Sequence, residues 1–247
     1  LPDLLPVLQG ADDNREAALR ELAALPGVYV PQVRPQGPVA RQCPVRLDGE
    51  PVTTAIFTPD TELGDLFMIE VERGCDWGCR FCLAAEVFSP ARYLPLESIL
   101  KVAAEGLKHR GRIGLVGAAV TGHPQLEAML VGLRELGADL TISSLRIKPL
   151  SENVLEAVMQ SGGRTLALAP EAATDRLRRI VRKGIREADI FDAVDRVAAY
   201  PLRHLKLYFM LGLPWETEAD TQAMVSLSME IRTRLDRQRP ACRLSLN

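Results

Sequence analysis

Three cysteines, Cys75, Cys79 and Cys82, are separated by three and then two residues. Gaps this short let one loop surround a metal cluster, and Gly74 and Gly78 supply the backbone freedom that such a tight curl requires. Three thiolates bind three irons of a four-iron cluster and leave the fourth iron open, whereas four thiolates leave no iron open. The spacing therefore predicts a [4Fe-4S] cluster that can bind a small molecule and pass an electron to it.

The alternatives are a structural zinc site and a disulfide pair. Structural zinc takes four ligands, often as two separated pairs, and no second Cys-x2-Cys or His-x3-His pair follows in the sequence. Cys43 and Cys242 stand alone, and His109, His123 and His204 lack metal-ligand spacing, so each histidine is expected at the surface. The pattern favours an iron–sulfur site over zinc or inert thiols.

The pattern Cys-x3-Cys-x-aromatic-Cys, with Phe81 as the aromatic residue, resembles that of the radical S-adenosylmethionine (SAM) enzymes. The resemblance implies that Cys75, Cys79 and Cys82 are metal ligands and catalytic residues, and that Phe81 lies against the cofactors. It implies that the amino and carboxylate groups of SAM bind the open iron. An electron then cleaves the sulfonium, and a 5′-deoxyadenosyl radical abstracts hydrogen from a substrate. The electron donor would be a reductase, a flavodoxin or a ferredoxin.

The composition suits an enzyme core. A chain of 247 residues with 47% hydrophobic content can bury a sizeable core in one domain. We expect no membrane association, because no apolar run reaches the length of a membrane span. A formal charge of −2 gives no indication of nucleic-acid binding, and five cysteines with three in one cluster predict a cytoplasmic protein.

The chain starts at Leu1 without an initiator methionine and stops just after an apolar segment, which predicts a piece of a longer protein. Residues 14–25 have helical spacing, and prolines then punctuate an extended stretch. We therefore expect a helical and extended, proline-rich lead-in over residues 1–65 and a core domain over residues 66–247.

Within residues 66–247, stretches of strand-like residues alternate with stretches of helical periodicity, which predicts a parallel sheet with helices outside. Right-handed crossovers would curl such a sheet into a half-barrel. This α/β order resembles the partial (β/α)6 TIM-like barrel of radical SAM enzymes. The predicted strands are Leu66–Val71, Ile113–Val120, Ala138–Leu145, Arg164–Ala169, Leu205–Leu211 and Ala241–Leu246.

Two predicted strand ends offer residues to the methionine part of SAM. Gly117 and Ala118 occupy the place where the family often has a Gly-Gly-Glu segment that receives the amino group; the glutamate is missing here, so backbone carbonyls would take over. Close packing of small residues is the alternative. After the third strand, the resemblance assigns Ser144 to the ribose or the carboxylate, with an ordinary turn residue as the alternative. Arg146 can hold a carboxylate with two hydrogen bonds.

The later strand ends complete the predicted pocket. Glu171 is placed to accept hydrogen bonds from both ribose hydroxyls, with a helix N-terminal charge as the alternative. By resemblance, Lys183 pairs with the SAM carboxylate, with Arg179 in reserve. Gly212 begins a Gly-Leu-Pro-x-Glu-Thr segment that resembles one beside the adenine; an ordinary strand-to-helix turn is the alternative.

Within the superfamily, segments such as Ser144–Arg146 and Ala169–Glu171 look most like proteins that carry a cobalamin-binding domain ahead of the core. The cobalamin signature Asp-x-His-x-x-Gly does not occur in this sequence, so cobalamin would have to come from a domain outside it. The leading hypothesis is a radical SAM enzyme that transfers a methyl or methylthio group. The competing hypotheses are an iron–sulfur electron-transfer or sensor module and a zinc-stabilised interaction domain.

Overall fold

The computed structural model describes residues 3–11, 14–33, 37–142 and 145–247 and divides into two compact units, residues 1–45 and 46–247. The first unit contains the helices α1 (Leu4–Gln9) and α2 (Arg15–Ala24). The predicted helix over residues 14–25 is confirmed, because Asn14 caps α2 by accepting a hydrogen bond from the Ala17 amide at 3.1 Å.

The second unit starts before the predicted core boundary at residue 65. Residues 52–54 pair with the strand β1 (Leu66–Glu70): the Glu70 amide donates to the Val52 carbonyl at 2.9 Å, and the Met68 amide donates to the Thr54 hydroxyl at 2.9 Å. This segment covers the outer edge of β1, which would otherwise expose unpaired backbone groups. The division of the protein into domains stays a prediction.

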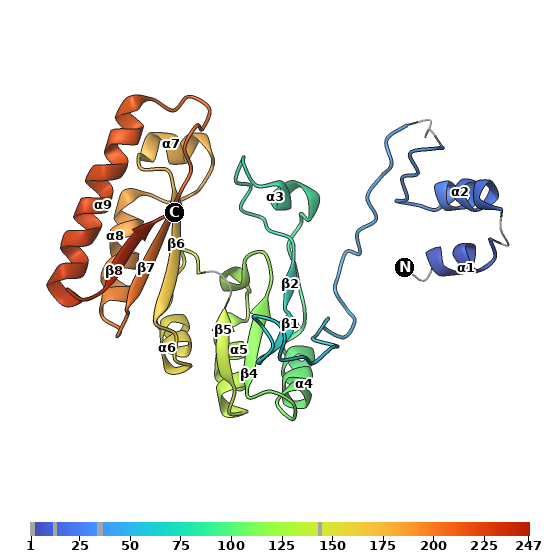
Figure 1. Ribbon diagram of the computed structural model, residues 1–247, viewed down its shortest axis with the longest axis horizontal. Coiled ribbons are helices and arrows are strands. Elements are labelled where there is room, and N and C mark those ends of the chain that lie inside the picture. Colours follow the sequence, from blue (N-terminus) through green and yellow to red (C-terminus); the bar gives the residue numbers. More distant parts are fainter. Residues whose placement is uncertain (1–2, 12–13, 34–36, 143–144) are drawn as a thin grey trace. The chain divides into compact units, whose positions relative to one another are not determined.

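In the described residues of this unit six parallel strands follow one another in the predicted order, which confirms the α/β fold (Figure 1). They form two sheets of three strands each rather than one sheet, because no ladder joins β5 to β6 among the described residues. The second predicted strand also stops earlier, at Val116, and Val120–Gly122 forms a 3-10 turn, η1. In spatial order the sheets are β1, β4 (Arg112–Val116) and β5 (Asp139–Ile142), and then β6 (Thr165–Glu171), β7 (His204–Phe209) and β8 (Arg243–Leu246).

Helices cover the outer faces of both sheets. On the first sheet α4 packs beside α5, and on the second α8 packs beside α9 (Figure 1). A short antiparallel pair, β2 (Glu72–Arg73) with β3 (Arg92–Tyr93), lies just beyond β1. The helices of this unit are α3 (Leu83–Val87), α4 (Leu96–Gly106), α5 (Leu126–Glu135), α6 (Glu152–Gln160), α7 (Asp175–Ile180), α8 (Glu187–Ala198) and α9 (Glu218–Gln238).

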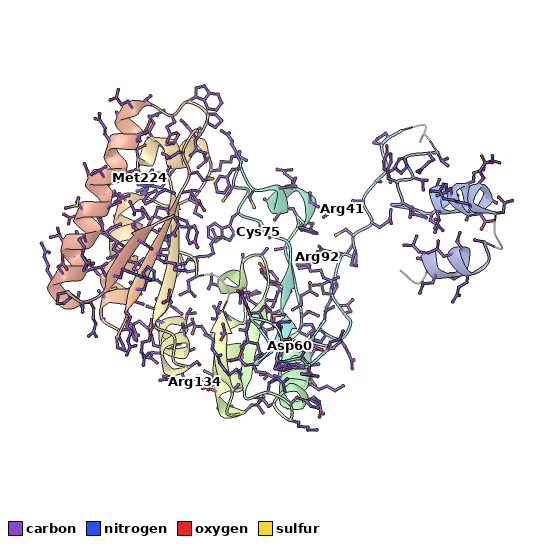
Figure 2. The ribbon with its side chains drawn as sticks, viewed as in Figure 1. Arg41, Asp60, Cys75, Arg92, Arg134 and Met224 are labelled. Carbon is purple, nitrogen blue, oxygen red and sulfur yellow. The ribbon has the colours of Figure 1, made fainter. Side chains whose placement is uncertain are left out.

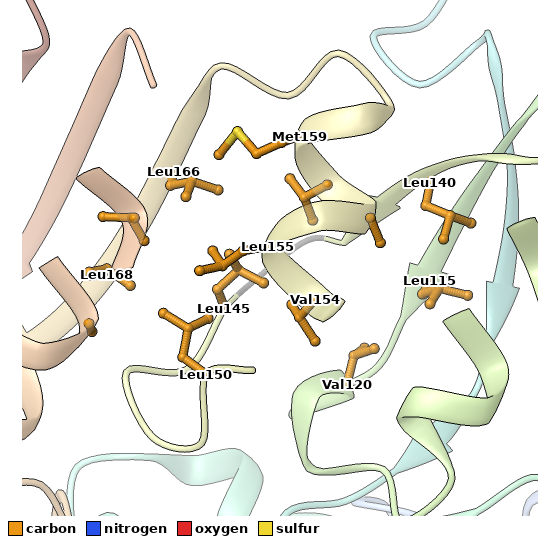
Figure 3. Packing of buried hydrophobic residues seen from close by; sticks show 14 of the residues in the cluster. Leu115, Val120, Leu140, Leu145, Leu150, Val154, Leu155, Met159, Leu166 and Leu168 are labelled. Atoms are coloured by element: carbon orange, nitrogen blue, oxygen red, sulfur yellow. The ribbon is translucent and has the colours of Figure 1, made fainter. Parts of the chain in front are cut away.

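One hydrophobic core spans the break between the sheets. Helix α6 lies there, and its buried Leu155 and Met159 belong to the same cluster as Leu140 of β5 and Leu166 of β6 (Figure 3). Apolar burial therefore joins the two sheets, between which the described ranges show no strand pairing, and the result is a half-barrel of two three-stranded sheets.

Helix α4 packs on β1 through Gly106. A Cβ atom at Gly106 would lie 2.2 Å from the ring of Phe67, which is buried. We expect Gly106→Ala to lower the free energy of unfolding by about 1 to 3 kcal/mol, because the overpacking outweighs the helix preference of alanine. Urea denaturation measures the change.

Gly111→Ala is the matched control. A Cβ atom at Gly111 meets no atom within 4 Å, so this variant should stay within about 0.5 kcal/mol of the wild type. Equal stability of the two variants would contradict the packing of α4 against Phe67.

Candidate functional site

The three cysteines lie on a loop between β2 and α3, at the carboxyl end of the first strand (Figure 2). Gly74 has a φ of 93°, and a Cβ atom there would lie 2.2 Å from the Phe88 carbonyl oxygen. Gly78 has a φ of 63°. Both glycines therefore have the backbone role that the sequence predicts, because residues with a Cβ atom rarely adopt these conformations.

The motif residue Arg80 anchors this loop to the end of α7. Its amide donates to the Val181 carbonyl at 2.9 Å, and its guanidinium donates to the Ile180 carbonyl at 2.9 Å. At the other end of the loop, the Asp76 carboxylate accepts the Ala91 amide at 2.8 Å. A positive side chain is favourable at the carbonyl end of a helix, so Arg80 suits this place.

All three cysteines are free and partly buried. Burial raises the pKa of the Cys79 thiol, Lys183 and Arg146 lower it, and Cys75 and Cys82 raise it. Lys183 and Arg146, which come from distant segments of the chain, are thus near enough to the cysteine loop for their charges to act on the Cys79 thiol.

The Arg146 guanidinium lies 3.4 Å from the centre of the Trp77 ring, a cation–π contact. Burial lowers the pKa of Arg146, whereas the neighbouring Cys75 and Cys79 raise it. Its Nε atom is buried and has no hydrogen-bond partner among the described residues. Arg146 is therefore held beside the cysteine loop with part of its hydrogen-bonding capacity unused.

Glu171 and Lys183 form an ion pair at 2.9 Å, and their side chains are 15% and 16% exposed. Glu171 ends β6 with a φ of 66°, at an irregularity in the pairing of β6 with β7. Non-glycine residues in this conformation are strained and occur often at functional sites. Two predicted cofactor-binding residues thus contact each other directly.

A cavity of about 190 Å³ opens at the carboxyl ends of the strands. Three predicted cofactor-binding residues, Ala118, Arg146 and Lys183, line it together with Ala169 and Ile185. The strand ends therefore bring residues from three distant segments to one cavity, as the barrel rule requires.

The other predicted residues lie elsewhere. Phe81 is 39% exposed on the cysteine loop, and Gly212 has a φ of 78° on a loop where a Cβ atom would meet nothing within 4 Å. Gly117 packs closely against Glu72, because a Cβ atom there would lie 2.3 Å from Cγ of Glu72, and its role in binding SAM stays a prediction. Ser144 lies outside the described residues.

The expectation of surface histidines is wrong for His123 and His204, which are only 4% and 8% exposed. His123 accepts the Gln125 amide at 3.1 Å, and the His204 ring lies 2.9 Å from the Ser245 hydroxyl. Hydrogen bonds therefore satisfy both rings inside the protein, which an isolated histidine in a sequence does not reveal.

Sequence reasoning missed two buried carboxylates, Glu72 and Asp220. Glu72 is 2% exposed, and burial raises its pKa, opposed by the hydrogen bond from the Ala119 amide and by the charge of Arg146. A charged residue directly after an apolar strand was the available signal for Glu72. For Asp220 the signal was the spacing Thr217-x-x-Asp220, a capping box at the start of α9.

Asp220 ties the loop after β7 to the loop after β6. It accepts the Thr174 hydroxyl at 2.5 Å, the Thr217 amide at 3.0 Å and the Thr217 hydroxyl at 2.7 Å, and it forms an ion pair with Arg176. The hydrogen bonds from Thr174 and Thr217 lower the pKa of Asp220 far below its usual range. The two strand-end loops are thus held together by one buried carboxylate.

The donor chemistry fits an iron–sulfur cluster. Thiolates bind iron, and two nearby cations offset the negative charge that such a cluster carries. No three His, Cys, Asp or Glu side chains come together as ligands of a single ion in the part of the chain that the structure describes. A cluster differs from a single ion because each thiolate binds a separate iron.

None of the helices in the described ranges is both long enough and apolar enough to cross a lipid bilayer.

A model of the radical SAM superfamily matches residues 69–227 of this chain. An uncharacterized protein from Methanocaldococcus jannaschii is 32% identical over 182 residues, which cover 72% of this chain and 40% of that protein. The ribosomal protein uS12 methylthiotransferase RimO from Thermodesulfovibrio yellowstonii is 27% identical over 177 residues, 66% of this chain and 41% of that protein. The chain spans about two fifths of the length of these relatives.

Among solved structures, the fold is similar to that of the radical SAM methyltransferase TsrM from Kitasatospora setae, whose structure contains cobalamin and a [4Fe-4S] cluster. The TM-score is 0.52 at 14% identity, and the match covers 66% of this chain and 34% of TsrM. This likeness confirms the predicted partial barrel.

The Asp220 contacts predict a pH-dependent contribution to stability. The pKa of Asp220 is lowered in the folded state, so its contribution is present above the usual aspartate pKa of about 3.9 and is lost as the pH falls below it. At pH 6 we expect Asp220→Asn to cost about 2 to 4 kcal/mol, because it weakens a buried network around Arg176. The difference from the wild type should narrow at pH 3, as urea denaturation of the cluster-free protein would show.

Asp236→Asn is the control on the same helix. Asp236 is 50% exposed and pairs with Arg232, so its loss should cost less than about 0.5 kcal/mol. A stability difference between Asp220→Asn and the wild type that does not change with pH would contradict the role of the Asp220 charge.

Proposed function

This chain belongs to the radical SAM superfamily, and from that membership we propose that it holds a [4Fe-4S] cluster on Cys75, Cys79 and Cys82 and binds SAM beside it. The observation that carries the proposal is the convergence of three free, partly buried thiols with Arg146 and Lys183 at the strand ends. When bound, the cluster supplies the electron that cleaves SAM to the 5′-deoxyadenosyl radical.

The cations of the site orient the polar groups of SAM. Arg146 offers a planar guanidinium, already stacked on Trp77, to the carboxylate. Lys183 also lines the cavity and offers an ammonium, and its ion pair with Glu171 holds the ammonium there before SAM arrives. Both groups are sheltered from water, which strengthens their interaction with a carboxylate.

The remaining predicted residues bind the nucleoside and shield the reaction. Glu171 accepts hydrogen bonds from the ribose hydroxyls, and Gly212 leaves room for the adenine on its open loop. Phe81 covers the cluster from its exposed position on the loop. Ala118 lines the methionine end of the cavity, and Gly117 leaves room for the side chain of Glu72 beside it. The role of Ser144 rests on its sequence position alone.

We propose a methyl or methylthio transfer as the overall reaction. The support comes from relatives whose names specify methylthio transfer, RimO and the threonylcarbamoyladenosine tRNA methylthiotransferase MtaB of Treponema pallidum, and from the fold of the methyltransferase TsrM. Cobalamin would then be provided by a domain outside this chain. A reductase, flavodoxin or ferredoxin in the cytoplasm would supply electrons.

Cluster assembly and SAM cleavage test the proposal. Anaerobic reconstitution with iron and sulfide, followed by reduction, should give an electron paramagnetic resonance signal that changes when SAM is added, and 5′-deoxyadenosine should form. In Cys79→Ala we expect no stable four-iron signal and at least a hundredfold loss of 5′-deoxyadenosine, because only two thiolates would hold the cluster.

Cys43→Ala is the matched control, since Cys43 is also a free, partly buried cysteine but lies outside the motif. It should keep the signal and the cleavage. A cluster signal that is indifferent to SAM would instead support an electron-transfer or sensor module, and stoichiometric zinc without iron uptake would support an interaction domain.

A further inference from the structure

Glu72 is a buried carboxylate with an unused oxygen. The side chain is 2% exposed, and its Oε1 atom accepts a hydrogen bond from the Ala119 amide. Its Oε2 atom is buried and has no hydrogen-bond partner within the described parts of the chain. Burying an unsatisfied carboxylate oxygen is costly, and such exceptions in a folded protein call for a specific explanation.

The surrounding backbone is shaped to hold Glu72 in this place. Glu72 lies on β2, opposite Tyr93 of β3, directly before the cysteine loop. Its side chain packs against Gly117 so closely that a Cβ atom on Gly117 would lie 2.3 Å from Cγ and 2.7 Å from Oε1 of Glu72. The carboxylate is thereby fixed between the end of β4 and the cysteine loop.

Arg146 presents the complementary unused group. Its Nε atom is likewise buried, with no hydrogen-bond partner in the portion of the chain that the structure describes, and its positive charge acts on Glu72 electrostatically. The contacts within the described ranges nevertheless include no ion pair between Glu72 and Arg146. A buried acceptor, Glu72, and a buried donor of opposite charge, Arg146, therefore lie near each other. Glu72 is close to Cys75 in the sequence, and Arg146 is close to Cys75 in the folded structure.

An α-amino acid matches this arrangement, because it carries an amino group and a carboxylate on the same carbon atom. A carboxylate accepts hydrogen bonds from an amino group, and a guanidinium donates to a carboxylate. We propose that Glu72 is a binding residue for the amino group of SAM, with Arg146 holding the adjacent carboxylate. This inference rests on the proposed function and adds a residue that the sequence did not indicate.

The test compares two ligands on the reconstituted, cluster-loaded protein by isothermal titration calorimetry. SAM carries the amino group and the carboxylate, whereas 5′-methylthioadenosine keeps the nucleoside and the sulfur but lacks both. In Glu72→Gln the side chain keeps its shape and an acceptor for Ala119, but a donor replaces one carboxylate oxygen. We expect SAM to bind at least about tenfold more weakly than to the wild type, and 5′-methylthioadenosine to bind equally to both.

Thermal unfolding of the SAM-free protein gives a second readout. Because glutamine replaces an unpaired buried charge, the melting temperature of Glu72→Gln should equal or exceed that of the wild type.

Glu70→Gln is the matched control: Glu70 pairs with Arg73 at 2.7 Å, so this variant should lose a little stability and no affinity for SAM. If Glu72→Gln fails to load the cluster, Glu72→Asp is tested instead. The aspartate keeps the charge, but its shorter side chain moves the carboxylate away from the amino group of SAM, so the same loss of SAM affinity is expected.

Unchanged SAM affinity in Glu72→Gln, or an equal loss for both ligands, would overturn the role of Glu72 while leaving SAM binding by the wild type intact. Failure of the wild type to bind SAM at all would instead overturn the proposed function, and this inference with it. The two failures are therefore distinguishable.

Discussion

The cysteine loop has to be held between two sheets that no backbone ladder joins in the described part of the chain. On one side the loop follows β2, which comes directly after β1 of the first sheet, and on the other Arg80 donates to the carbonyls at the end of α7. Below it, the buried side chains of α6 join β5 to β6 (Figure 3). The position of the three thiols relative to Arg146 and Lys183 depends on both connections, because these cations come from the segments after β5 and α7.

Several charged residues of the site are held in arrangements that add little to the stability of the fold. Glu72 and Arg146 each bury a polar atom that no described residue satisfies, and Glu171 has a strained backbone conformation. Such features destabilise a folded protein unless neighbouring contacts hold them. Asp220 is the counterpart: its carboxylate is fully used by Thr174, Thr217 and Arg176, and it fixes two of the loops that surround the strand ends. Asp220 thus supplies fixed contacts near the strand ends, while Glu72 and Arg146 keep polar atoms available for a ligand, as a preorganised binding site requires.

Several predicted features depend on local sequence and are confirmed. Apolar periodicity placed six strands and their helices in the right order, because burial on one face imposes that periodicity. Gly74 and Gly78 have the positive φ values that a tight loop demands. Strand ends were less accurate: the second strand stops at Val116 rather than Val120, because the chain turns there and leads into η1, although the residues up to Val120 are small or apolar as in a strand.

By itself the sequence determined the kind of site, a three-cysteine loop after the first of six parallel strands, because metal-ligand spacing and side-chain periodicity are properties of neighbouring residues. Only the tertiary structure decided which partners complete it. Arg80 meets a carbonyl 100 residues away, Glu171 pairs with Lys183, and Glu72 is buried against Gly117. These contacts join segments that are far apart in the chain, and whether a charged group is paired or left unsatisfied is decided only when those segments pack together.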